Sequence, residues 1–83
     1  MNTLAVYPNP GNAWVAMDYA YGIVGEAWLT ITDVTGRKVQ QVRLSAERGQ
    51  FIWDVRQARP GAYSVELTVD GNTLAVERLI IQP

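Results

Sequence analysis

The sequence predicts an all-β fold, an immunoglobulin-like antiparallel β-sandwich of about seven strands. Short runs of alternating apolar and polar residues are separated by Gly, Pro, Asn and Asp about every ten residues, as in sandwiches of short strands. The runs are rich in β-branched and aromatic residues, and none shows the period of about 3.6 residues that indicates a helix. We expect strands at 3–7, 14–21, 27–33, 37–44, 51–55, 62–69 and 73–82.

Alternation within these runs predicts which side chains face the core. Leu29 and Ile31 are expected inward, with Thr30 and Thr32 outward, because one face of an antiparallel sheet is commonly wet. The last run differs, since Leu79-Ile80-Ile81 is apolar on both faces and has no clear inward set. The other residues expected to point inward are Val15, Met17, Tyr19, Tyr21, Phe51, Trp53, Val55, Tyr63, Val65, Leu67 and Val69.

Three segments have the chemistry of turns. Pro8-Asn9-Pro10 ends the first strand, because two prolines lock φ and remove two backbone donors. We interpret this segment as a rigid turn that fixes the first strand against the sandwich, with direct recognition by a partner as the alternative. Asp33-Val34-Thr35-Gly36 is expected to form a tight turn with Gly36 at positive φ. Asp70-Gly71 predicts a two-residue hairpin.

Two local features refine the expected strands. The apolar set of the fourth run changes parity, which predicts a bulge near Gln40-Gln41. Tyr63, close to the start of the sixth run, is expected to bury its ring and to donate its hydroxyl to a backbone carbonyl, as in the tyrosine corner of sandwich domains.

The composition excludes several classes of function for this single domain of 83 residues. Histidine and cysteine are absent, which removes the usual general base, the commonest transition-metal ligand and any disulfide. The net charge is −1 with scattered charges, so no basic stripe is available for nucleic acid. We therefore expect no catalysis and no cofactor or metal. The weak residual candidates for acid–base or nucleophilic chemistry are Asp18, Asp33, Asp54, Ser45, Ser64 and Lys38, and those for calcium are Asp33 and Asp70.

Targeting signals are not evident. No apolar run approaches the roughly 20 residues that span a bilayer. The segment Met1–Leu4 has neither the basic nor the apolar region of a signal peptide. If the protein is exported, we expect that address on another part of a longer chain.

Four segments, in their order and spacing, resemble the C-terminal sorting domain of the type IX (Por) secretion system of Bacteroidetes-type bacteria. They are Tyr7-Pro8-Asn9-Pro10, Asp33 to Val39, Gly61 to Val65 and Glu77 to Ile81, and the resemblance extends from about Leu4 to Gln82. The sequence departs from the family pattern at Arg78, where Lys is usual, and at Ala58, where a larger Leu is usual.

The resemblance implies that residues 1–83 are a single C-terminal sorting domain of a larger exported protein, covalently attached to an N-terminal cargo domain. It implies passage through the periplasm, recognition by the outer-membrane type IX translocon, and arrival at the cell surface or outside the cell. In the commonest type a sortase removes the domain. An over-apolar last strand could also form a dimer by pairing of edge strands.

The resemblance also indicates candidate recognition residues. At the third turn they are Gly36, Arg37 and Lys38, with a surface ion pair between Arg37 and Asp33 as the simpler role. At the end of the chain they are Arg78, Leu79, Ile80 and Ile81, which export machinery could read by strand addition or which could simply pair within the sheet. We assign structural roles to Tyr7, Pro8, Asn9, Pro10, Gly61 and Tyr63.

Tryptophan suggests an alternative function. Trp14 and Trp28 fall on faces opposite the main apolar sets, and an exposed indole can stack on a sugar, whereas Trp53 is expected in the core. An accessory immunoglobulin-like or carbohydrate-binding module of a secreted bacterial enzyme is therefore the alternative, although no cluster of polar hydrogen-bonding residues lies near either tryptophan in the sequence.

Overall fold

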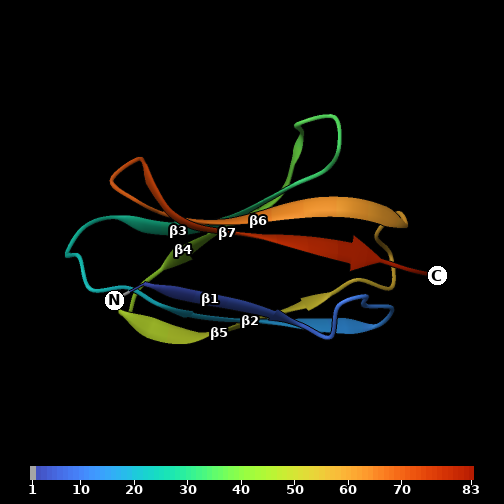
Figure 1. The fold of residues 1–83 in the computed structure, drawn as a ribbon, viewed down its shortest axis with the longest axis horizontal. Coiled ribbons are helices and arrows are strands. Elements are labelled where there is room, and N and C mark those ends of the chain that lie inside the picture. Colours follow the sequence, from blue (N-terminus) through green and yellow to red (C-terminus); the bar gives the residue numbers. More distant parts are fainter. Residues whose placement is uncertain (1) are drawn as a thin grey trace.

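The computed structural model describes residues 2–83 and shows seven strands in two antiparallel sheets (Figure 1). One sheet has the order β1-β2-β5 and the other β4-β3-β6-β7. The described chain contains no helix long and apolar enough to cross a membrane. The strands are β1 (Thr3–Tyr7), β2 (Trp14–Ala20), β3 (Ala27–Thr32), β4 (Lys38–Leu44), β5 (Arg48–Asp54), β6 (Gly61–Val69) and β7 (Asn72–Ile81).

This architecture confirms the predicted immunoglobulin-like sandwich. The chain changes sheet between β2 and β3, between β4 and β5, and between β5 and β6, which is a Greek-key arrangement. The two ends of the molecule carry different loops (Figure 1). The beginning of β1 and the β6–β7 turn lie at one end, and we call the other end the C-terminal pole, formed by residues 8–13, 33–37, 55–60 and 78–83. Met1, where the segment tested for a signal peptide begins, lies outside the described residues.

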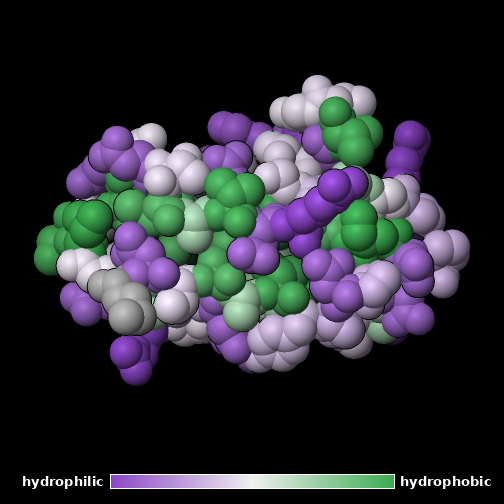
Figure 2. Space-filling view, in the orientation of Figure 1, coloured by the Kyte–Doolittle hydropathy of each residue, from purple (hydrophilic) through white to green (hydrophobic). Residues whose placement is uncertain are grey.

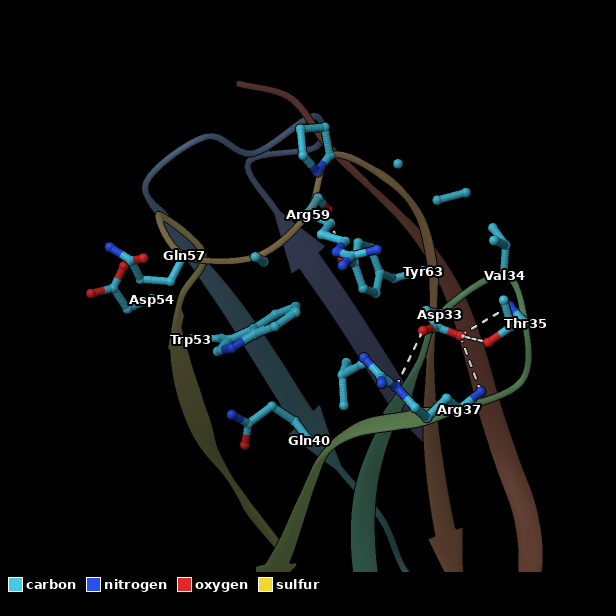
Figure 3. Close-up of a pocket in the computed structure, with 15 residues that line it drawn as sticks. Asp33, Val34, Thr35, Arg37, Gln40, Trp53, Asp54, Gln57, Arg59 and Tyr63 are labelled. Carbon is cyan, nitrogen blue, oxygen red and sulfur yellow. Dashed lines mark hydrogen bonds and ion pairs between the residues drawn. The ribbon is translucent and has the colours of Figure 1, made fainter.

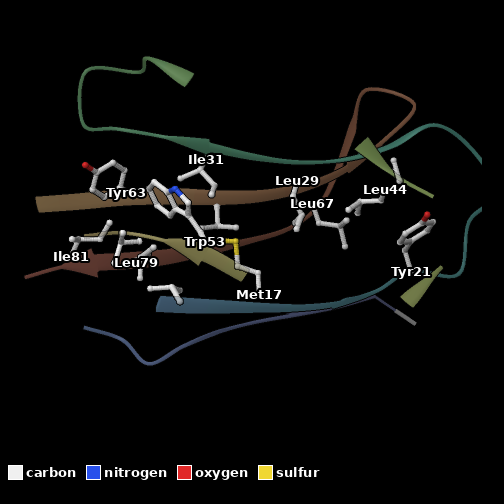
Figure 4. Close-up of a cluster of buried hydrophobic side chains, with 14 of the residues drawn as sticks. Met17, Tyr21, Leu29, Ile31, Leu44, Trp53, Tyr63, Leu67, Leu79 and Ile81 are labelled. Atoms are coloured by element: carbon white, nitrogen blue, oxygen red, sulfur yellow. The ribbon is translucent and has the colours of Figure 1, made fainter. Parts of the chain in front are cut away.

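Side chains from both sheets meet in one core (Figure 4). Met17 comes from the three-stranded sheet, and Leu29 and Leu67 come from the four-stranded sheet; all three are fully buried. Every side chain predicted to point inward is buried except Tyr19 and Phe51, which are half-buried and pack against the core. Alternation within short runs therefore predicted the buried face correctly.

Thr30 points outward, as predicted, but the expectation that this face is wet fails at this position. Thr30 keeps only 8% of its surface exposed. It lies on β3 at the centre of its sheet, and its cross-strand neighbours are Gln41 on β4 and Glu66 on β6. Because paired residues share a face, these two longer side chains flank the smaller threonine and cover it.

The bulge predicted near Gln40-Gln41 is present in β4 at the adjacent Val39, since Ile31 pairs with Gln40 and Thr32 pairs with Lys38. One strand boundary differs from the prediction. The segment expected as a break before the fifth strand is partly strand, because β5 begins at Arg48. Gly49 lies within it, and a Cβ there would meet the Tyr19 hydroxyl at 2.6 Å. This glycine therefore makes room for a neighbouring side chain and does not end the strand.

Candidate recognition surface

The β3–β4 turn is held by its own first residue. The Asp33 carboxylate accepts hydrogen bonds from the Thr35 backbone N–H at 2.9 Å, the Thr35 hydroxyl at 2.6 Å and the Arg37 backbone N–H at 3.0 Å. The Thr35 hydroxyl, with the two backbone donors and the nearby guanidinium, lowers the pKa of Asp33. Gly36 has a φ of 87°, which confirms the predicted positive φ. The turn is thus locally specified and stiff.

Arg37 and Lys38 extend from this turn into solvent. The expected ion pair is present, with Arg37 Nε 3.7 Å from Asp33 Oδ2. The Arg37 side chain nevertheless keeps 76% of its surface exposed, and Lys38 is exposed at the first position of β4. Both cations are therefore accessible to a partner.

The four candidate recognition residues at the end of β7 lie on two different faces of the strand. Leu79 and Ile81 are buried, with 0% and 2% of their surfaces exposed, and belong to the core. Arg78 and Ile80 pair with Ser64 and Ala62 on the opposite, outward face of the sheet. Arg78 is exposed and Ile80 is half-buried. Residues 78–81 therefore alternate between the outward face and the core, although no clear inward set was evident from the sequence. Of the four candidates, only Arg78 and Ile80 are accessible to a partner.

Asn9 bonds to the outer edge of β7. Its side-chain amide donates to the Arg78 carbonyl at 2.7 Å, and its carbonyl oxygen accepts from the Ile80 N–H at 2.9 Å. Gly11 continues the same pattern, donating to the Ile80 carbonyl at 2.9 Å and accepting from the Gln82 N–H at 2.8 Å. The loop after β1 thus takes the place of a further strand along this part of β7.

The bonds from Asn9 and Gly11 limit what can pair with the outer edge of β7. Between Arg78 and Gln82 the outer backbone groups of β7 are already bonded to Asn9 and Gly11. Strand addition or an edge-paired dimer at this place would have to displace the loop. The interpretation of Pro8-Asn9-Pro10 as a rigid structural turn is therefore extended: its central side chain closes a sheet edge.

Tyr63 forms the predicted tyrosine corner. Its ring is buried, packs edge-on against Trp53 with ring centroids 5.7 Å apart, and its hydroxyl donates to the Arg59 carbonyl at 2.6 Å. Beside it, a hollow of about 580 Å³ separates the β3–β4 turn from the loop before β6 (Figure 3). Trp53, Ala58 and Tyr63 line this hollow.

The β3–β4 turn also approaches the outer face of β6 and β7. Asp33 and Val34 from the turn, together with Ala62, Ser64, Val76 and Arg78, line a groove of about 290 Å³, which we call the outer groove. The structure therefore brings two of the predicted recognition segments, the turn and the end of β7, to one place. Val34, which the sequence analysis did not single out, is 79% exposed. The feature of the sequence that could have pointed to it is an apolar residue within a turn of otherwise polar residues and glycine.

Two of the aspartates considered for acid–base chemistry, Asp18 and Asp54, have structural partners. Asp18 accepts from the Tyr7 hydroxyl at 2.6 Å and from Gln50 at 2.7 Å. The Arg56 side chain, 2.6 Å from Asp54, lowers the pKa of that carboxyl to about 2. Within residues 2–83 no group of three or more acidic side chains is placed to hold a metal ion.

The two candidate sugar platforms are partly covered. The Arg56 guanidinium lies 5.2 Å from the ring centroid of Trp14, and that of Arg43 lies 5.8 Å from Trp28. Such cation–π contacts occupy a ring face that a sugar would need. Trp53 is in the core, as predicted. The sugar-binding alternative gains no support from these positions.

The fold and the C-terminal pole define an immunoglobulin-like sandwich whose exposed candidate residues lie on one turn and one strand end. A family model described as the secretion system C-terminal sorting domain matches residues 5–82. The chain belongs to this family, the C-terminal sorting domains of type IX secretion, as the four sequence segments predicted. Membership implies attachment to a cargo protein, handling by the type IX system, and a destination at the cell surface or outside the cell. Comparison with curated proteins gave no match.

Proposed function

We propose that residues 1–83 act as a non-catalytic C-terminal sorting signal, recognised in the periplasm by the outer-membrane type IX translocon, which then delivers the attached cargo. The observation that carries this proposal is the gathering of the family segments at the C-terminal pole. The Pro-Asn-Pro loop, the Gly36-Arg37-Lys38 turn and the end of β7 come from distant parts of the sequence and lie at one end of the sandwich (Figure 1).

Within this pole the accessible residues carry recognition. Arg37, Lys38 and Arg78 present positive charge, and Ile80 presents a half-buried apolar side chain on the outward face. Leu79 and Ile81 contribute by holding β7 in the core, because a partner cannot reach fully buried side chains without unfolding the strand. A sortase that removes the domain would act on the chain ahead of β1, away from this pole.

A transplant experiment tests the sorting role. Residues 2–83 are fused to the C-terminus of a periplasmic reporter in a host with type IX secretion, and surface and released reporter are measured. We expect delivery to the cell surface or medium. Retention of a folded fusion in the periplasm would contradict the proposal. The same fusion in a host without the translocon is the matched control and should stay in the periplasm.

Point variants locate the recognised residues more cleanly than truncation. Deleting residues 79–83 removes two core side chains, so loss of export would not separate recognition from folding. Arg78→Glu and Ile80→Ser change only the outward face. We expect both to reduce export of a domain that remains folded. Normal export of both variants would exclude the end of β7 from the recognised surface.

A further inference from the structure

Val34 is an exposed valine carried by a turn that is held by its own hydrogen bonds. Val34 keeps 79% of its surface in contact with solvent, and the turn that carries it is closed by the hydrogen bonds of Asp33. The turn projects from the body of the molecule in Figure 1. A stiff projecting support presents the side chain in one orientation, which lowers the entropy lost when a partner covers it.

The outer groove lies directly beside this valine. Figure 2 shows apolar surface on the projecting turn and, separated from it by polar side chains, a second apolar area over the C-terminal end of β7. The outer groove, of about 290 Å³, stands at the lower limit of the roughly 300–1,000 Å³ of small-molecule pockets. It has room for a side chain or two of a protein partner.

The accessible charge around the outer groove is mainly positive. Arg78 lines it, and Lys38 is exposed at the start of β4, whereas Arg37 lines the separate hollow beside Tyr63. The one carboxylate that lines the groove, Asp33, is already engaged by Thr35 and Arg37, with only 22% of its side chain exposed. Glu66 lies farther along β6, beside Val76, where it accepts a hydrogen bond from Thr73 at 3.3 Å. A complementary partner would therefore carry carboxylates.

We propose that Val34 and the outer groove dock a protein segment that presents an apolar side chain flanked by Asp or Glu residues. This inference rests on the proposed sorting function and specifies the chemistry of its partner. Val34 is the apolar anchor, and Arg78, with the nearby Lys38, orients the segment by charge complementarity. The anchor lies in the family's turn segment, next to the glycine and cations that the sequence analysis selected.

Export of the transplanted domain tests this docking site. Val34→Ser removes the apolar anchor, and Val24→Ser, at a position 89% exposed in the loop between β2 and β3, is its matched control. Loss of one buried valine from an interface corresponds to roughly a ten-fold weakening. We expect about ten-fold less export for Val34→Ser, unchanged export for Val24→Ser, and thermal midpoints equal to that of the original domain.

Charge variants test the second part of the proposal. Arg78→Glu should reduce export about ten-fold, because it places like charge against the partner's carboxylates, whereas Arg78→Lys should keep most export. Arg48→Glu, at an exposed position on β5, is the control and should have no effect. If Val34→Ser or Arg78→Glu is exported as efficiently as its control variant, the docking site is wrong, although the sorting role still holds. Failure of the unaltered domain to direct export would refute both.

Discussion

Replacing Asn9 with alanine tests the edge cover on β7. The substitution removes two hydrogen bonds, one to the Arg78 carbonyl and one from the Ile80 N–H, while Gly11 keeps its own bonds to the strand. A hydrogen bond contributes about 0.5–1.5 kcal/mol net, and the site is exposed enough for water to replace part of the loss. We expect Asn9→Ala to lower the free energy of unfolding by about 2 kcal/mol.

The effect is measurable in two ways. For a domain of this size, about 2 kcal/mol corresponds to a fall of roughly 10 °C in the thermal midpoint followed by circular dichroism. Hydrogen exchange gives the local readout, because the Ile80 amide should exchange faster in the variant than in the original domain. The Gln82 amide, bonded to the Gly11 carbonyl, should change less.

Asn12→Ala is the matched control. Asn12 is exposed in the same loop, and among residues 2–83 no side-chain hydrogen bond of Asn12 is present. It should leave the midpoint nearly unchanged. If Asn9→Ala unfolds within a degree or two of Asn12→Ala and the Ile80 amide keeps its protection, the side chain does not close the edge of β7.

Three further predictions concern the core and the turn. Tyr63→Phe should lower the free energy of unfolding by about 1 kcal/mol, measured by urea unfolding, because it removes the bond to the Arg59 carbonyl. Arg59→Ala keeps that carbonyl and should have little effect; equal losses in the two variants would contradict the tyrosine corner. Leu79→Ala should destabilise the domain by about 2–5 kcal/mol and Ile80→Ala by much less, and similar losses would show that β7 does not alternate. Because the pKa of Asp33 is lowered in the folded domain, its stabilisation is complete above the unfolded value of 3.8 and is lost as pH falls through the folded value. The difference in thermal midpoint between the original domain and Asp33→Asn should therefore shrink from pH 6 to pH 2, and a constant difference would exclude this role.

Local chemistry predicted most of the strands and turns. The alternation from Tyr63 to Val69 was confirmed because each side chain's face follows from its neighbours two residues away. Asp70 and Gly71 both have positive φ, at 50° and 82°, as the mirror-image hairpin turns require. In both cases the information lies within a few residues of the sequence.

Long-range contacts were not predictable in the same way. The bonds of Asn9 reach residues 69 and 71 positions later in the chain, and no pattern near Asn9 indicates which strand it will meet. The sequence also did not show which of Leu79, Ile80 and Ile81 face the core, because three consecutive apolar residues do not alternate in polarity. Their faces are set by the register in which β7 pairs with β6. The exposure of Val34 likewise depends on how far its turn projects from the sheet.

The separation of the two ends of the chain has a consequence for the attached cargo. The Cα atoms extend 37 Å along the long axis, with the start of β1 at one end and Pro83 at the other (Figure 1). A domain joined ahead of β1 is held at the far end of this rod from the C-terminal pole. For a passenger joined there, the sandwich would act as a spacer that keeps the passenger's bulk away from the surface on which the proposed contact is made. One signal could then serve passengers of very different sizes.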